Sequence, residues 1–134
     1  MTATYPTPID SLPYSTYVVP ATFDTALKVV RDMLLRDNLL IPAEIDMSGR
    51  IRQVLGIHPS APCRLLLVDS HSTLLYAAER KDVTAFFLPL HVLVTGQGPR
   101  TLISVLTRPG SPLLAQLAAR VVRTLEKISL RQAA

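Results

Sequence analysis

The longest stretch of the chain without a charged side chain lies between Asp82 and Arg100, and its centre is the apolar segment 86–94. Read with a period of two, one set of alternate residues forms a wholly apolar face: Phe86, Leu88, Leu90, Val92 and Val94. The other face is mixed and carries Phe87, Pro89, His91, Leu93 and Thr95. This pattern predicts the central strand of the fold, with one face in the core and the other partly covered.

Four other segments have the β-branched and apolar composition of strands: residues 14–21, 39–46, 63–69 and 101–107. In the second of them, alternation predicts one face made of Leu39, Ile41, Ala43 and Ile45. Pro42 cannot donate to a strand ladder, so this segment is expected at a sheet edge. The run 65–68, Leu-Leu-Leu-Val, predicts a strand that is buried on both faces.

Helical spacing of apolar residues predicts a helix that begins at Thr22 or Asp24 and ends near Asp37, with Asn38 as a left-handed stop. Ser48 is expected to cap a short helix that ends at Gly56. Its apolar residues, predicted to point inward, are Ile51, Val54 and Leu55. A further short helix is expected around residues 74–78. The longest helix starts at Ser111 and Pro112, and its apolar stripe is Leu114, Leu117, Val121, Leu125 and Ile128.

The predicted order is strand, helix, strand, short helix, strand, helix, strand, strand, helix. Gly96–Gln97–Gly98–Pro99 joins the last two strands as a hairpin. Hairpins combined with helices of mixed length indicate an α+β fold, with an antiparallel sheet of about five strands and helices packed on one face. Residues 14–131 are expected to form one domain. Residues 1–13, which are rich in proline, are expected to form an extended arm.

Composition narrows the class of protein. With 134 residues and 49% hydrophobic content, the chain can build a core without disulfides, and Cys63 is its only cysteine. The interpretation favoured for Cys63 is a small buried hydrophobe, and the alternative is a nucleophile whose thiolate is favoured by Arg64. No apolar leader is visible, and the central apolar run is shorter than the ~20 residues of a membrane span. We therefore expect a cytoplasmic protein that does not contact a membrane.

The segment 39–56 resembles a block of the domain of unknown function 302 family: an extended segment, Glu-Ile-Asp, a short helix and Leu-Gly. Arg64-Leu65-Leu66 and the pattern Leu88-Pro89-x-x-Val92 fall where that family has its third strand and its Leu-Pro strand. The resemblance spans residues 22–107. It implies a two-layer α+β fold akin to half of the TATA-binding protein and tight homodimers, and it implies no established activity.

The chain departs from this family at the positions where many members carry cysteine. It has Asp69-Ser70-His71 in place of Cys-Asn-Pro, and Leu90-His91 in place of Cys-Asn after Leu-Pro. A thiol-based function is therefore not transferred. The resemblance also implies that Asp69, His71 and His91 lie on neighbouring strand ends. A metal or proton-transfer site there is one hypothesis, and a hydrogen-bonded histidine on a partly covered sheet is the favoured one.

Several polar residues are candidates for a site. If the protein is an enzyme, the acid–base candidates are Glu44, Asp69 and His91. The ligand-binding candidates are Glu44, Arg64, Phe87 and His91, and weak metal candidates are Asp69, His71 and His91. For Glu44 and Asp46, the favoured interpretation is structural: Glu44 pairs with an arginine on the face of the sheet that the helices leave open, and Asp46 helps to cap the short helix. No cofactor is expected.

Four basic residues share one side of the predicted last helix: Arg120, Arg123, Lys127 and Arg131. They could bind phosphates, but a solvated face complementing the helix dipole is the favoured interpretation, so no specific nucleic-acid partner is expected. The leading functional hypothesis is a non-catalytic homodimeric binding or regulatory module whose partners are a second copy and a small-molecule ligand. An enzyme and a binder of anionic surfaces are the alternatives.

Overall fold

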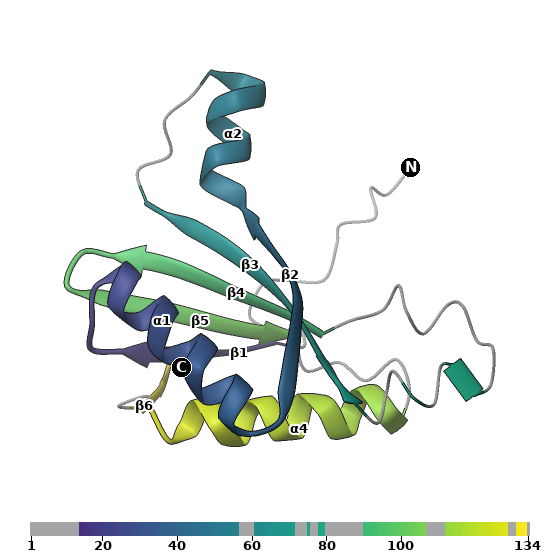
Figure 1. Ribbon diagram of the computed structural model, residues 1–134. Coiled ribbons are helices and arrows are strands. Elements are labelled where there is room, and N and C mark those ends of the chain that lie inside the picture. Colours follow the sequence, from purple (N-terminus) through teal and green to yellow (C-terminus); the bar gives the residue numbers. More distant parts are fainter. Residues whose placement is uncertain are drawn as a thin grey trace, which may run out of the picture.

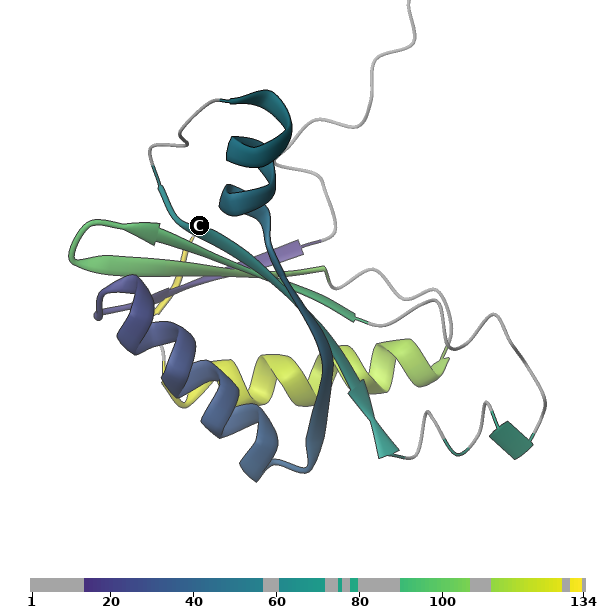
Figure 2. The ribbon, with the colours of Figure 1, turned by 45° about the horizontal axis from the view of Figure 1, so that its top comes forward.

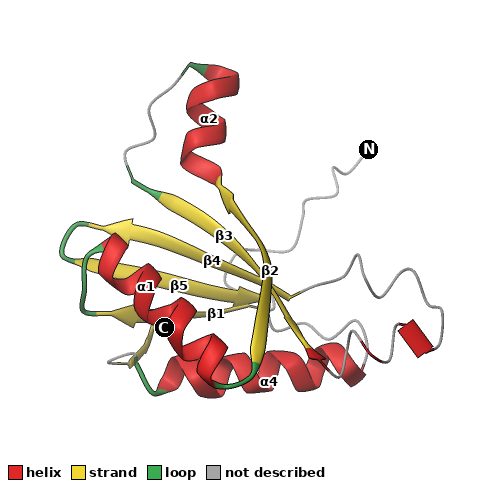
Figure 3. Ribbon diagram, in the orientation of Figure 1, coloured by secondary structure: helices red, strands yellow, loops and turns green. Residues whose placement is uncertain are grey.

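The computed structural model describes residues 14–56, 61–71, 75, 78–79, 90–106, 112–128 and 131–133. The described elements form one twisted antiparallel sheet with two long helices beneath it (Figures 1 and 3). In chain order they are β1 (Tyr14–Val19), α1 (Phe23–Arg36), β2 (Leu39–Asp46), α2 (Met47–Leu55), β3 (Cys63–Ser70), β4 (Leu90–Gln97), β5 (Arg100–Leu106), α4 (Pro112–Glu126) and β6 (Arg131–Ala133).

The strand order in the sheet is β2-β3-β4-β5-β1-β6, and every neighbouring pair is antiparallel. The apolar segment that organises the sequence pattern supplies β4, which lies inside the sheet between β3 and β5. The α+β prediction is therefore confirmed. The three-residue β6 was not predicted; it contains Arg131, which the sequence pattern assigned to the last helix.

The core lies between the sheet and the two long helices. On β4, Leu90, Val92 and Val94 are buried, as the period of two predicted. They meet Val30 and Leu34 of α1 and the predicted stripe of α4, represented by Leu117, Val121 and Leu125. Each fully buried aliphatic side chain of this kind stabilises the fold by roughly 1.5–3 kcal/mol. We call the side of the sheet that α1 and α4 cover the helix face (Figure 2).

The signals that bound the helices act as the sequence predicted in three places. Asn38, the second residue after α1, has a positive φ of 60°, and Gly56 ends α2 in the left-handed conformation with φ 67°. Pro112 occupies the first position of α4. These residues stop or start a helix because of their own backbone preferences, so neighbouring elements are not needed to predict them.

A polar cluster fixes α4 against the turn that follows α1. The hydroxyl of Thr124, which is 1% exposed, donates a hydrogen bond to the carboxylate of Asp37. Lys127 Nζ lies 3.3 Å from the same carboxylate, and Arg120 donates to the Asp37 carbonyl at 2.8 Å. Two of the four cations predicted to form a solvated face are therefore engaged within the protein.

A β-bulge in β2 changes which of its residues share a face. Leu40 pairs with Asp69, but Ala43 pairs with Leu67, so β2 has one residue more than β3 between these two pairs. The bulge includes Pro42, which cannot donate to the ladder. The prediction that Leu39 and Ala43 share a face is therefore wrong. The predicted edge position of this strand is confirmed.

The helix α2 differs most from expectation. Its N-cap is Asp46 rather than Ser48, and the Asp46 carboxylate accepts a hydrogen bond from the Gly49 N–H at 2.9 Å. No residue of α2 is buried, and Val54 and Leu55 are 78% and 63% exposed. The prediction that these two residues point inward is wrong, because α2 extends away from the sheet at the ends of β2 and β3 (Figure 1).

Some predictions lie outside the described residues: the arm 1–13, most of the helix 74–78, residues 86–89 and the side chain of Leu114. Among the helices that the structure describes, none is long and apolar enough to cross a membrane.

Candidate functional site: the open face of the sheet

The side of the sheet opposite α1 and α4 is apolar and only half-buried. Leu67 pairs with His91 and Leu65 pairs with Leu93, and each pair is one position from the buried pair Leu66–Val92. Because successive side chains alternate between faces, these residues point away from the helices. We call this surface the open face. Its half-buried members are Thr16, Val18, Leu40, Ala43, Ile45, Cys63, Leu65, Leu67, Leu93, Thr95, Leu102 and Ser104.

The open face continues across five strands. On β5 and β1, Leu102 pairs with Val18 and Ser104 pairs with Thr16, whose hydroxyl oxygens lie 3.1 Å apart. Leu65 and Leu67 remain half-buried. The prediction that β3 is buried on both faces is therefore not met among the described residues of a single chain. No described helix lies across this surface, and Figure 2 shows α1 and α4 together on the opposite side of the sheet.

A buried carboxyl group lies at one end of the open face. Asp69 pairs with Leu40 and is only 3% exposed, and its Oδ1 accepts a hydrogen bond from the Ser70 N–H at 2.9 Å. Burial raises the pKa of Asp69, and the hydrogen bond from Ser70 opposes this rise. Burial of this carboxyl group therefore favours its protonated form relative to that of an exposed aspartate.

His91 lies on the open face and is exposed, so the described part of the chain does not cover it as the sequence pattern predicted. Within the β3–β4 ladder it pairs with Leu67, two residues from Asp69. Asp69 and His91 are therefore diagonal neighbours on one face of the sheet.

Glu44 lies on the helix face instead. It pairs with Leu66, a core residue, and its Oε1 accepts a hydrogen bond from Arg31 Nε of α1 at 2.5 Å. Since Glu44 and His91 lie on opposite faces, the structure does not bring the three acid–base candidates into one site. The predicted ion pair of Glu44 with an arginine is confirmed, but its predicted place on the open face is wrong, because the partner is Arg31 of α1.

Arg64, a ligand-binding candidate, also lies on the helix face, where it pairs with Asp46 on one side and with Val94 on the other. Its Nε is buried and, among the described residues, has no hydrogen-bond partner. Phe87 lies outside the described residues. Of the ligand-binding candidates that the structure describes, only His91 therefore lies on the open face.

The weak metal candidates do not form a described cluster. His71 is exposed and directly follows β3, while Asp69 is buried. In the part of the chain that the structure describes, no group of three potential metal ligands occurs.

Cys63 lies at the opposite end of the open face, next to α2. Its N–H donates to the hydroxyl oxygen of Ser48 at 3.1 Å, and the hydroxyl of Thr95 lies 3.8 Å from its Sγ. The side chain is half-buried, so the expected fully buried hydrophobe is only partly realised. The Ser48–Cys63 contact ties the start of α2 to the start of β3.

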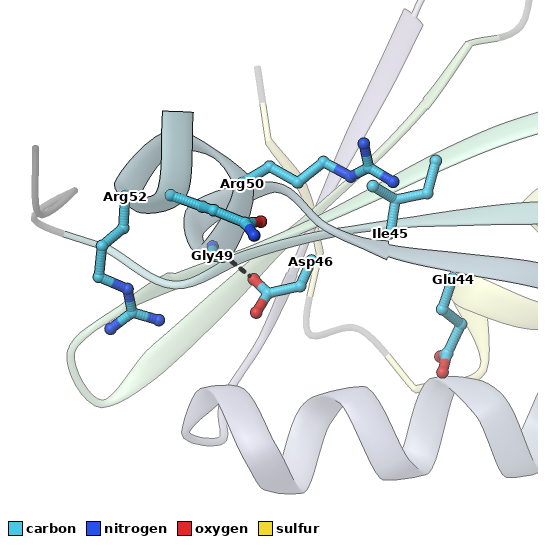
Figure 4. A pocket seen from close by; sticks show the side chains of 7 residues that line it. Glu44, Ile45, Asp46, Gly49, Arg50 and Arg52 are labelled. Carbon is cyan, nitrogen blue, oxygen red and sulfur yellow. Dashed lines mark hydrogen bonds between the residues drawn. The ribbon is translucent and has the colours of Figure 1, made fainter. Parts of the chain in front are cut away.

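A shallow depression of about 360 Å³ lies where β2 enters α2 and was not predicted from the sequence. Its lining residues are Glu44, Ile45, Asp46, Gly49, Arg50, Arg52 and Gln53 (Figure 4). The hydrogen bond from the Gly49 N–H holds the pKa of Asp46 below its usual range, and the hydrogen bond from the Ser48 hydroxyl adds to this effect. Arg50 and Arg52 extend in opposite directions in Figure 4, so they do not converge on one anion. The open face is therefore the stronger candidate surface.

Comparisons with known proteins agree with the fold. The chain matches the family model described as "Domain of unknown function DUF302" over residues 15–129. It is similar to an uncharacterized conserved DUF302 protein from Bacillus stearothermophilus, known from a crystal structure. The TM-score is 0.70 at 16% identity, and the match covers 88% of this chain and 99% of that chain. No curated protein matches the chain.

Proposed function

The chain belongs to the DUF302 family, and from this premise we propose that it is a small non-catalytic binding or regulatory module that acts as a homodimer through its open face. The family match and the structural neighbour carry no activity, so the proposal depends on the surface itself. The ligand class that suits this surface is a small, largely apolar molecule enclosed between two copies.

The observation that carries the proposal is the chemistry of the open face. Eight apolar side chains other than cysteine are only half-buried across five neighbouring strands: Val18, Leu40, Ala43, Ile45, Leu65, Leu67, Leu93 and Leu102. Contiguous apolar patches of more than a few hundred Å² are rare on monomers and mark interaction sites or ligand grooves. The only charged side chain among the described β3 and β4 residues of this face is Asp69, which is buried.

Native mass spectrometry of the untreated protein tests the proposal, because it reports the oligomer and any retained ligand together. The expected mass is twice the chain mass of 14.7 kDa, with or without a bound molecule. Leu93→Asp, at the centre of the open face, is expected to give a monomer. The control is Leu35→Asp on α1, where the leucine is 54% exposed. A monomeric wild-type protein at micromolar concentration contradicts the proposal.

An acid–base enzyme is a second candidate, favoured by the raised pKa of Asp69 beside His91 on the same face. In this case Asp69 holds a proton and the exposed imidazole exchanges one with a bound substrate. A retained small molecule whose turnover stops in both Asp69→Asn and His91→Gln supports this candidate. Retention without turnover supports the binding module.

An anionic-surface binder that uses α4 receives less support. Arg120 and Lys127 contact Asp37, and Arg131 belongs to β6. Arg123 is therefore the one member of the predicted cationic face that remains an exposed helical side chain among the described residues.

A further inference from the structure

The helix α2 carries the signals of a well-defined helix but lacks the packing that normally stabilises one. Asp46 caps its first turn and Gly56 ends it. A nine-residue helix alone is marginal in water, and most helical stability in proteins comes from burying an apolar face. In α2, Val54 and Leu55 lie three and four residues after Ile51, so the three apolar side chains share one face of the helix. Val54 and Leu55 are 78% and 63% exposed, so this face is open.

The attachment of α2 prevents it from covering its own sheet. Ser48 accepts a hydrogen bond from the Cys63 N–H, so the first turn of α2 is held at the beginning of β3. From this point the helix extends away from the sheet (Figure 1), and its last turn carries Val54 and Leu55 beyond the strand ends. Within the part of the chain that the structure describes, no apolar surface covers these side chains, and a second molecule can supply one.

The area of the open face can be compared with what a dimer of this chain needs. Strands about 4.8 Å apart with a rise of about 3.3 Å per residue give a face of five strands by six residues a footprint of about 480 Å². Two such faces together bury about 960 Å², less than the ~1,200 Å² at the lower end of stable interfaces. A nine-residue helix adds about 140 Å² on each side, which brings the total to about 1,240 Å².

We propose that α2 is a docking arm: in the dimer, Val54 and Leu55 of each protomer pack on the open face of the second copy. This inference rests on the proposed homodimer and specifies how it is closed. A second copy satisfies both exposed surfaces at once, because each chain carries one arm and one face, as an interface with two-fold symmetry requires. The polar side chains Arg50, Arg52 and Gln53 then remain at the rim of the interface.

The test compares the dimer dissociation constants of the wild type, Val54→Asp, Leu55→Asp and the matched control Leu35→Asp by sedimentation equilibrium. Both α2 variants are expected to raise the constant at least tenfold, because they place a charge against an apolar face. The control, an exposed leucine of α1, is expected to change it less than twofold. Far-ultraviolet circular dichroism of each variant checks that the fold is retained.

A second measurement detects the proposed contacts between protomers directly in the wild-type protein. In a dimer mixed from isotope-labelled and unlabelled protomers, filtered nuclear Overhauser spectra should show contacts between the Val54 and Leu55 methyl groups of one chain and the Leu65, Leu67 or Leu93 methyl groups of the other. A wild-type monomer overturns the proposed homodimer itself. A wild-type dimer without these contacts, or one that Val54→Asp and Leu55→Asp leave intact, overturns the docking arm and leaves the homodimer standing.

Discussion

The hydroxyl of Thr124 donates a hydrogen bond to the carboxylate of Asp37, and this contact joins the last turns of α4 to the turn that ends α1. The two residues lie far apart in the sequence, and Thr124 is buried. Thr124→Val keeps the shape of the side chain and removes the donor. We expect it to lower the Tm by about 2–5 °C in calorimetry. Thr25→Val on the exposed side of α1 serves as the control and is expected to leave the Tm unchanged.

The same contact makes stability depend on pH. The hydrogen bond from Thr124, helped by Lys127 and Arg120, lowers the pKa of Asp37 in the folded protein. The folded pKa lies below the unfolded value of about 3.9, so the contribution is fully present above that value and is lost as the pH falls through the folded pKa. The drop in Tm between pH 5 and pH 2.5 should be smaller in Asp37→Asn than in the wild type. Equal drops contradict this assignment.

Gly96 is expected to tolerate no side chain. Its N–H donates to the Pro62 carbonyl at 2.9 Å, and a Cβ at Gly96 would lie 2.8 Å from Pro62 Cγ and 3.0 Å from Phe23 Cβ. Gly96→Ala should therefore lower the free energy of unfolding by about 1–3 kcal/mol in urea titrations. Gly98, with φ 63° and no atom within 4 Å of a Cβ, provides the contrast. Gly98→Asn should be nearly neutral, because asparagine accepts positive φ.

Asp69 should change the stability of the fold with pH in the direction opposite to Asp37. Burial raises its folded pKa above the unfolded value, so folding favours the protonated carboxyl group. Its contribution to stability is present below the unfolded pKa and is lost as the pH rises through the folded pKa. Asp69→Asn, whose amide oxygen can still accept the Ser70 N–H, should raise the Tm at pH 7 and change it little at pH 3.5. A lower Tm at pH 7 would show that the charged form is needed.

His91→Gln separates a role in assembly from a role in folding. Because His91 is exposed on the open face, we expect urea-induced unfolding of the isolated protomer to change by less than about 0.5 kcal/mol. Dimerisation or ligand retention, measured by native mass spectrometry, should weaken, since the proposed interface covers this residue. Assembly and ligand retention like those of the wild type would reduce His91 to a surface residue.

We expect no specific binding of nucleic acid. Binding through a phosphate track would fall steeply with salt, and each neutralised cation would reduce that slope. Fluorescence anisotropy with duplex DNA at physiological salt should show no submicromolar binding. Submicromolar binding that is lost when Arg120, Arg123 and Lys127 are changed to Ala would overturn this expectation. Arg123→Ala alone distinguishes lost binding from lost stability, because Arg120 and Lys127 also hold Asp37.

Local patterns in the sequence were enough to predict strands β1 to β5, the long helices and the core face of β4. A period of two or 3.6 follows from backbone geometry, and Asn38, Gly56 and Pro112 act through their own φ preferences. Asp46 was also interpreted correctly as a structural group, because an acidic residue before a short helix is a common cap. These features require only residues that are near one another in the chain.

The faces of the candidate residues depended on tertiary structure. The bulge at Pro42 adds one residue to β2, and because side chains alternate with a period of two, one extra residue moves every later side chain of the strand to the other face. Glu44 therefore points to α1 rather than to His91. In the same way, the apolar stripe of α2 was read from its spacing, but spacing does not say what the stripe contacts. Only the position of α2 beyond the ends of β2 and β3 shows that Val54 and Leu55 have no apolar surface of their own chain within reach among the described residues.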